Sequence, residues 1–233
     1  MLRESKGNMY RFVTHTWNTV KGRCPHNCSY CYMKAFPIGD LRLDERELDT
    51  DLGQQNVIFV GSSCDMFADA VPAEWIHRTL DACRKHRNNR YLFQTKNPGR
   101  YMSPGRYLDI IHDLPADSIV GTTIESDLHH PEIMGAAPHP AVRAAYMAII
   151  SDTNPGQQTF ITIEPILRFE LAPFVDMIRR ARPTFVNIGA DSKGHNLPEP
   201  TEDETINLIF SLKQFTRVNV KRNLERIIGT REL

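Results

Sequence analysis

The stretch Thr16–Lys34, TWNTVKGRCPHNCSYCYMK, holds three of the five cysteines of the chain within eight residues. Two cysteine pairs would indicate disulfides or a complete zinc site, whereas C-x3-C-x2-C leaves one ligand short of four. Iron–sulfur clusters ordinarily take four thiolates, and an open position is typical of a reactive metal centre rather than a structural one. The alternative is a zinc site that His15 or His26 completes.

Composition limits the class of protein. The 233 residues carry 28 Lys plus Arg and 28 Asp plus Glu, so the formal net charge is zero. This balance argues against binding of nucleic acids or membranes through bulk positive charge, although a local basic groove stays open. The N-terminus MLRESKGNMYRF lacks the apolar core of a signal peptide, and no apolar run reaches the length of a membrane span. Because the cysteine count is odd, we expect reduced thiols in a cytoplasmic protein without a membrane partner.

Short apolar runs rich in β-forming residues recur along the chain and predict strands. A first strand is predicted at Phe12–Val20, directly before the cysteines. The later runs are nearly continuous rather than alternating, which is typical of strands covered on both faces. They are Val57–Val60, Tyr91–Gln94, Ile119–Ile124, Thr159–Ile163, Thr184–Ile188 and Val218–Val220.

Helical patterns lie between these runs. The predicted apolar faces are Ile76, Leu80 and Cys83 after Pro72; Tyr107, Ile110, Ile111 and Leu114 after a Ser103-Pro104 start; Val142, Ala145, Tyr146 and Ile149; and Phe174, Met177, Ile178 and Ala181. Thr201 and Glu204 form a capping box before a further helix. The alternation predicts one α/β domain over residues 1–233 with a parallel sheet, either doubly wound or a barrel. In both, ligands bind at the C-terminal ends of the strands.

The cysteine motif, with Tyr30 directly before the third cysteine, resembles the signature of the radical S-adenosylmethionine superfamily. The resemblance implies a partial (β/α)6 TIM-like barrel and a [4Fe–4S] cluster on Cys24, Cys28 and Cys31, in the loop 22–34. It implies that S-adenosylmethionine binds the open iron through its amino and carboxylate groups. An electron from the cluster would then cleave this cofactor, and the resulting 5′-deoxyadenosyl radical would abstract hydrogen from a substrate.

The same resemblance places the remaining cofactor contacts at the strand ends. Tyr30 would lie against the adenine. The other expected contacts are Gly61, Ser62 and Ser63 near the methionine amine, Thr123, Glu125 and Ser126 near the ribose, and Glu164 and Gly189 at the ends of the next two strands.

Four single residues carry hypotheses with plain alternatives. Lys96 is predicted to bind a carboxylate or phosphate of cofactor or substrate, although lysines are also common on solvated surfaces. For Glu125 the alternative is a helix-capping carboxylate, and for Glu164 it is a buried ion pair with a lysine. Cys64 is predicted to be the catalytic residue that returns a hydrogen atom to a product radical. The alternative is that Cys64, as is expected for Cys83, is only a small buried residue of the core.

Five further motifs, TWN, VGS-x-x-D-x-F, TK-x-P, IEP and IGA-x-S, resemble the phage-associated three-cysteine-motif proteins from Thr16 to about Lys221, although the cysteine interval there is often longer. CPHNCSYCY also resembles the photoproduct lyases of DNA repair. These resemblances and the basic segment Arg217–Arg226, in a C-terminal extension of about 216–233, favour a nucleotide or nucleic-acid component as substrate. A peptide or a small metabolite is the alternative. An external electron donor is implied, and a partner protein that closes the small barrel is a further prediction.

Overall fold

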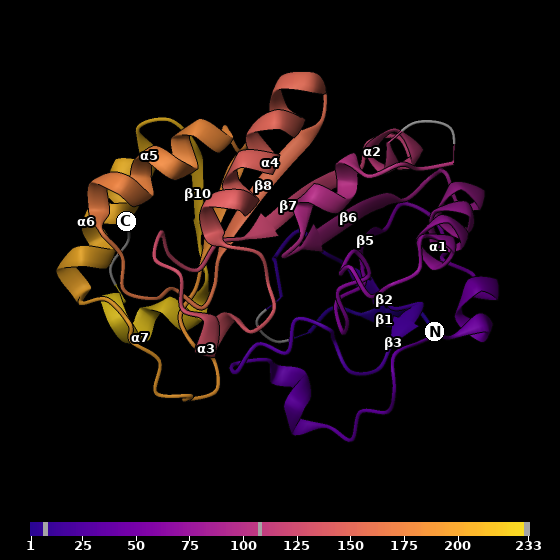
Figure 1. The fold of residues 1–233 in the computed structure, drawn as a ribbon, viewed down its shortest axis with the longest axis horizontal. Coiled ribbons are helices and arrows are strands. Elements are labelled where there is room, and N and C mark those ends of the chain that lie inside the picture. Colours follow the sequence, from indigo (N-terminus) through magenta and orange to yellow (C-terminus); the bar gives the residue numbers. More distant parts are fainter. Residues whose placement is uncertain (7–8, 107–108, 231–233) are drawn as a thin grey trace.

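A computed structural model of the chain describes residues 1–6, 9–106 and 109–230. In these ranges one sheet has the strand order β1-β2-β5-β6-β7-β8-β9-β10, with β1 antiparallel and the others mutually parallel (Figure 1). The strands are β1 (Arg3–Glu4), β2 (His15–Trp17), β5 (Val57–Val60), β6 (Arg90–Thr95), β7 (Ile119–Thr123), β8 (Gln158–Ile163), β9 (Phe185–Ile188) and β10 (Arg217–Val220). A second pair, β3 (Val20–Lys21) and β4 (Arg42–Leu43), borders the cysteine loop.

The strand order decides between the two architectures that the sequence left open. A doubly wound sheet reverses its order at a switch point, whereas here each crossover from β2 onward places the next strand at the same advancing edge. Among the described residues β10 pairs with β9 and not with β1, so the sheet stays open. The α/β class and the partial TIM-like barrel are therefore confirmed. Every predicted strand is present, although the first is confined to β2.

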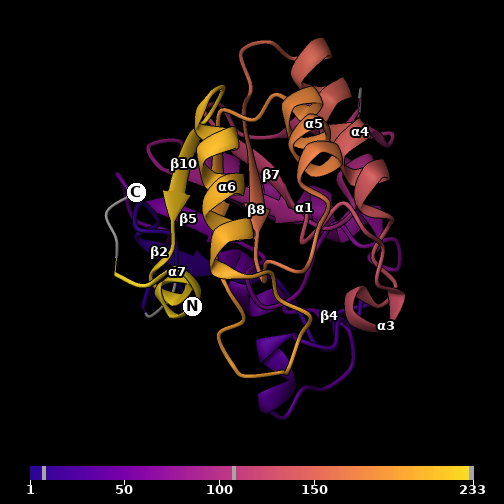
Figure 2. The ribbon, with the colours of Figure 1, turned by 90° about the vertical axis from the view of Figure 1, so that its left-hand side faces the viewer.

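The described helices are α1 (Ala73–Lys85), α2 (Ile110–Asp113), α3 (Pro131–Met134), α4 (Pro140–Thr153), α5 (Leu171–Ala181), α6 (Glu202–Lys213) and α7 (Glu225–Ile228). The long helices α1, α4, α5 and α6 cover the outer face of the curved sheet, whereas α3 lies against the cysteine loop (Figure 1). Four 3₁₀ turns complete the described elements: η1 (Tyr32–Ala35), η2 (Glu45–Asp49), η3 (Pro98–Met102) and η4 (Arg222–Leu224). Neighbouring helices α4, α5 and α6 pack in sequence (Figure 2). Across the described ranges, no helix combines the length and apolar character that crossing a membrane requires.

The inner face of the sheet has its own core, at the end where the strands begin. Leu92, Ile119, Phe160 and Phe185, from the first halves of their strands, pack against an N-terminal segment that contains Tyr10. This plug fills the inner face where the strands begin, and the Tyr10 hydroxyl reaches along it to Gln94 at 2.6 Å and to Thr162 at 2.8 Å. The C-terminal ends stay available for polar side chains, as the fold class predicts.

Two helix predictions need correction. The Ser103-Pro104 start is wrong: Ser103 ends η3 in an extended conformation, Pro104 forms an isolated bridge with Asp109, and α2 begins only at Ile110. Tyr107, the first apolar residue predicted for that helix, lies outside the described residues.

The predicted face of α4 is also wrong, although the helix itself is confirmed. Val142, Tyr146 and Ile149 are 46%, 36% and 43% exposed, while Arg143 and Met147 are buried. The reason is electrostatic, because the Arg143 side chain reaches inward to Glu125 and so fixes which face of the helix meets the sheet. The capping box of Thr201 and Glu204 is present at the start of α6.

Candidate active site

The cysteine loop lies between β3 and η1, at the end of the barrel where the parallel strands finish. Cys28 is buried, and Cys24 and Cys31 are partly exposed. The loop is held from one side by the segment that contains α3. Ser29 N–H donates to the Ile133 carbonyl at 2.8 Å, and the Cys28 thiol donates to the Met134 carbonyl at 3.2 Å.

Gly135 allows this close packing. Its φ of +63° is in the left-handed region, and a Cβ there would lie 2.0 Å from the carbonyl oxygen of His26. The next N–H, of Ala136, donates to that same carbonyl at 2.8 Å. A residue with a side chain at position 135 would therefore push the cysteine loop away from its support.

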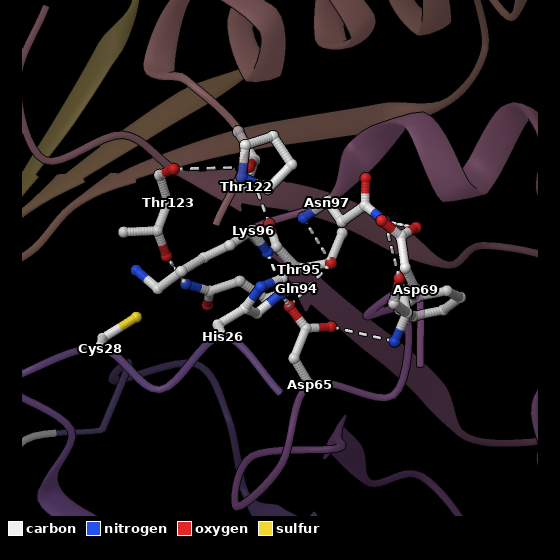
Figure 3. Close-up of polar contacts among 12 residues, drawn as sticks. His26, Cys28, Asp65, Asp69, Gln94, Thr95, Lys96, Asn97, Thr122 and Thr123 are labelled. Atoms are coloured by element: carbon white, nitrogen blue, oxygen red, sulfur yellow. Dashed lines mark hydrogen bonds and ion pairs between the residues drawn. The ribbon is translucent and has the colours of Figure 1, made fainter. Parts of the chain in front are cut away.

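Asp65 anchors the loop from the other side (Figure 3). The His26 Nε2–Asp65 Oδ2 distance is 2.8 Å, and Asp65 also accepts bonds from the Thr95 hydroxyl at 2.9 Å and the Lys96 N–H at 2.8 Å. Burial favours the neutral carboxyl, but the hydrogen bond and charge of His26, together with the N–H groups of Lys96 and Phe67, outweigh it and lower the pKa of Asp65. The loop is thus fixed to the ends of β5 and β6 by a charge-assisted hydrogen bond.

A second polar network joins Tyr30 to the barrel. Glu125, fully buried after β7, accepts from Lys96 Nζ at 2.6 Å, from Arg143 Nη1 at 2.7 Å and from the Tyr30 hydroxyl. Burial would raise the pKa of Glu125, but Arg143 and Lys96 outweigh it and hold the pKa well below its ordinary value. The structure therefore brings together Tyr30, Lys96 and Glu125, three of the residues singled out from the sequence.

Cys64 lies beside the motif cysteines. It is 2% exposed, and the interaction between its thiol and that of Cys24 lowers the pKa of Cys24 to about 6. The same interaction, together with burial, raises the pKa of Cys64. Burial also raises the pKa of Cys28. Cys83 lies in the core on α1, as expected.

The turn after β5 is fixed by Asn18. Gly61 N–H donates to the Trp17 carbonyl at 2.9 Å, Ser63 N–H donates to Asn18 Oδ1 at 2.9 Å, and Asn18 Nδ2 donates to the Ser62 hydroxyl at 3.2 Å. The Ser62 carbonyl accepts from the Tyr32 hydroxyl at 2.7 Å. The three residues Gly61, Ser62 and Ser63 therefore stand next to the cysteine loop in a well-defined conformation.

Polar side chains form a row across the inner face of the sheet. Thr123, Thr162, Asn187 and Asn219 stand in register on β7 to β10. Gln94 Nε2 donates to the Thr123 hydroxyl at 2.8 Å, and Asn219 Nδ2 donates to Asn187 Oδ1 at 3.0 Å. Asn187 is 2% exposed, and its Nδ2 has no hydrogen-bond partner among the described residues.

Three of the residues predicted to contact the cofactor are either apart from the cysteine loop or bonded to other protein groups. Ser126 is buried, and its hydroxyl donates to the Arg168 carbonyl at 2.6 Å. Glu164 forms the ion pair with a lysine that the sequence left as the alternative, at 2.6 Å from Lys221 Nζ. A Cβ on Gly189 would lie 2.7 Å from Glu164 Oε1, so this glycine makes room for the carboxylate.

The chemistry of the donor set fits an iron–sulfur cluster. The loop offers three thiols, soft ligands suited to iron–sulfur clusters, and Cys64 adds a fourth nearby. In the described part of the chain no three His, Cys, Asp or Glu side chains converge as a cage for a single metal ion. A cluster does not require such convergence, because each thiolate binds a different iron. The zinc alternative needs a histidine beside the three thiols: His26 lies in the loop with Nε2 bonded to Asp65, and His15 begins β2.

Sequence reasoning missed the residues that hold this site in place. Asp65 stands inside the quoted VGS-x-x-D-x-F motif, and Asn18 inside TWN, so both carried a signal. Arg143 carried none, because a buried arginine in a helical segment has no local pattern that separates it from a surface arginine.

The fold is one that radical S-adenosylmethionine enzymes share. A cysteine-to-serine mutant of spore photoproduct lyase matches 92% of this chain and 78% of its own, with a TM-score of 0.61 and 10% identity. A spore photoproduct lyase mutant with bound AdoMet and dinucleoside spore photoproduct matches 90% of this chain and 64% of its own, with a TM-score of 0.55 and 10% identity. No curated protein sequence matches significantly. A family model described as "Protein of unknown function (DUF5131)" matches residues 8–169, and the chain belongs to that family.

Proposed function

We propose that this protein is a radical S-adenosylmethionine enzyme. One observation carries the proposal: a loop with three closely spaced thiols lies at the C-terminal ends of the parallel strands, in a fold shared with spore photoproduct lyase. When bound, a [4Fe–4S] cluster would supply the electron that cleaves S-adenosylmethionine to the 5′-deoxyadenosyl radical, which abstracts hydrogen from the substrate. Cys24, Cys28 and Cys31 would hold the cluster, and an external electron donor would supply the electron.

The chain's own residues would orient the cofactors. Asp65, through His26, fixes the loop relative to β5 and β6, and the Glu125 network fixes Tyr30 relative to β7. A preorganised site of this kind loses little conformational entropy when it binds a cofactor. The aromatic plug around Tyr10 fills the inner face of the half-barrel where the strands begin.

We assign the cofactor contacts on this basis. An amine is a donor, and Ser63 N–H is already bonded to Asn18, so the carbonyls of the turn 61–63 are the groups that suit the methionine amine. Tyr30 would place its ring against the adenine. Thr123, at the end of β7, would reach the ribose. The carboxylates and Ser126 are engaged by protein groups, so their part is to support these contacts.

The direct test is the formation of 5′-deoxyadenosine. The protein is purified without oxygen, reconstituted with iron and sulfide, and given S-adenosylmethionine and a strong reductant. We expect iron and sulfide near four per chain by the cluster's own stoichiometry, and 5′-deoxyadenosine that is lost in Cys28→Ala. A colourless protein with tightly bound zinc and no product would overturn the proposal in favour of the zinc alternative.

For the substrate we propose a nucleotide or a nucleic-acid component. The inner polar row supports this, because the unpartnered Asn187 Nδ2 is a buried donor that a base carbonyl would satisfy. Arg217 on β10 lies over the ring of Phe185, and Lys221, directly after that strand, lies over the ring of Tyr10. Spore photoproduct lyase, a structural neighbour, is described with a dinucleoside bound.

The substrate class is tested by stimulation of cofactor cleavage. Dinucleotides, single-stranded DNA and peptides are added in parallel, and 5′-deoxyadenosine is measured over time. We expect nucleotides to raise the rate and Asn187→Leu to reduce that stimulation, with cleavage in the absence of substrate unchanged. Stimulation by peptides alone would favour the peptide alternative. The phage association and a closing partner protein stay predictions.

Cys64 is proposed as the hydrogen donor to a product radical. It borders the cysteine loop, and its thiol is reduced. In Cys64→Ala, turnover would stall after the substrate radical forms. Product yield equal to that of the wild type would contradict this role.

A further inference from the structure

A fourth thiol stands at the cysteine loop. Cys64 is buried in the cluster of core residues against which Cys24 packs, and its neighbour Asp65 binds His26 of the cysteine loop. Cys31 is also close enough to influence Cys64 electrostatically. The fifth cysteine, Cys83, lies instead on the core face of α1. Four of the five cysteines of the chain thus lie in the cysteine loop or directly beside it.

The position of Cys64 is set by a rigid turn. The preceding residues are tied to β2 and its C-terminal flank by bonds from Gly61 to Trp17 and from Ser63 to Asn18. The following residue, Asp65, has a side chain only 10% exposed and holds His26 of the loop. Cys64 is therefore placed between two anchors, and it cannot move away from the loop without breaking one of them.

The chemistry of a cubane cluster gives this thiol a role. Such clusters ordinarily take four cysteine thiolates, one on each iron, and the motif supplies three. A metal ion deprotonates a coordinating thiol even where burial has kept it neutral. The nearest further thiol in the described chain is thus suited to the iron that the motif leaves without a ligand.

We propose that Cys64 is the fourth cluster ligand while no S-adenosylmethionine is bound. This inference rests on the proposed function. When the cluster binds to the protein, a bond forms between Cys64 Sγ and iron, and the thiol proton leaves to solvent. When the amine and carboxylate of S-adenosylmethionine take that iron, the bond breaks and the thiolate regains a proton, with no change of oxidation state. Without S-adenosylmethionine, Cys64 then protects the fourth iron from oxidants. Binding of S-adenosylmethionine displaces the Cys64 thiolate from that iron.

The test measures loss of the iron to which none of the three motif cysteines binds. Wild type, Cys64→Ala, Cys64→Ser and the control Cys83→Ala are reconstituted without S-adenosylmethionine, and circular dichroism checks that each is folded. Each is then treated with one equivalent of ferricyanide, and the three-iron cluster signal is quantified by electron paramagnetic resonance. We expect several-fold more three-iron cluster in Cys64→Ala than in wild type and Cys83→Ala.

A second readout uses the reduced cluster. The resonance spectra of wild type and Cys64→Ser should differ before S-adenosylmethionine is added and coincide afterwards. Equal three-iron signals in wild type, Cys64→Ala and Cys83→Ala would overturn the inference and leave the proposed function intact. Absence of a four-iron cluster from the wild type would instead overturn the proposed function.

Discussion

Two glutamates end neighbouring strands of the same sheet, yet their surroundings differ. Glu125, after β7, is fully buried and bonded to Arg143, Lys96 and Tyr30. Glu164, after β8, has a side chain 17% exposed and is bonded to Lys221 and Asn223. Both carboxylates were expected to contact the cofactor. The structure places the first beside the cysteine loop and the second at the open side of the half-barrel.

The difference shows what each carboxylate does for the fold. The Glu125 network joins three distant parts of the chain: the cysteine loop, the end of β6 and helix α4. The Glu164 network joins β8 to the segment after β10 and reaches solvent. Removing one partner of a buried ion pair leaves an uncompensated charge and lowers stability strongly. In a partly solvated pair, water stabilises the charge that remains, so the loss is small.

The largest effect is expected for Arg143→Met. The substitution leaves Glu125 buried with one cation fewer, and breaking a buried pair in this way costs about 3–5 kcal/mol. We expect the free energy of unfolding, measured by urea denaturation, to fall by that amount. A loss below about 1 kcal/mol would mean that water reaches Glu125 and that the two networks do not differ.

The pH dependence of Glu125→Gln sharpens the comparison. Because the folded pKa of Glu125 is lowered, its stabilisation is present above the unfolded value of about 4.3 and is lost as pH falls through the folded pKa. We therefore expect Glu125→Gln to be less stable than wild type by about 3 kcal/mol near neutral pH. Urea unfolding repeated under acid conditions should show the gap narrowing. A gap that stays constant with pH would contradict the network of charges described here.

Gly189→Ala tests the crowding around Glu164. The new Cβ would meet Glu164 Oε1 at 2.7 Å and Asn223 Oδ1 at 2.8 Å, so the carboxylate must shift. We expect a loss of about 1–3 kcal/mol in thermal or urea unfolding. Gly156→Ala is the matched control, since nothing lies within 4 Å of its added Cβ. Equal behaviour of the two variants would show that the Glu164 network adapts freely.

The smallest effect is expected for Lys221→Met. Glu164 keeps Asn223 and some contact with water, so the loss is about 1 kcal/mol. Urea unfolding beside Arg143→Met gives the comparison directly. A loss as large as that of Arg143→Met would place Glu164 in a dry environment after all.

Most of the sheet was predictable because its strands carry a local pattern. The runs at 57–60, 119–124 and 159–163 are apolar on both sides of the chain, and each forms a strand within a residue or two. The failures occurred where a distant contact overrides local preference. Arg143 turns α4 by pairing with a carboxylate on another element, and the bridge from Pro104 to Asp109 displaces the start of α2.

The sequence alone determined the spacing of the three cysteines, the alternation of strands and helices, and hence the superfamily resemblance, because these depend on residues close along the chain. Only the tertiary structure decided which carboxylate lies beside the cysteine loop, that Asp65 binds His26, and that Cys64 lies in the core cluster against which Cys24 packs. Those contacts link residues from different strands, and the barrel brings them together by ordering its parallel strands around one open end.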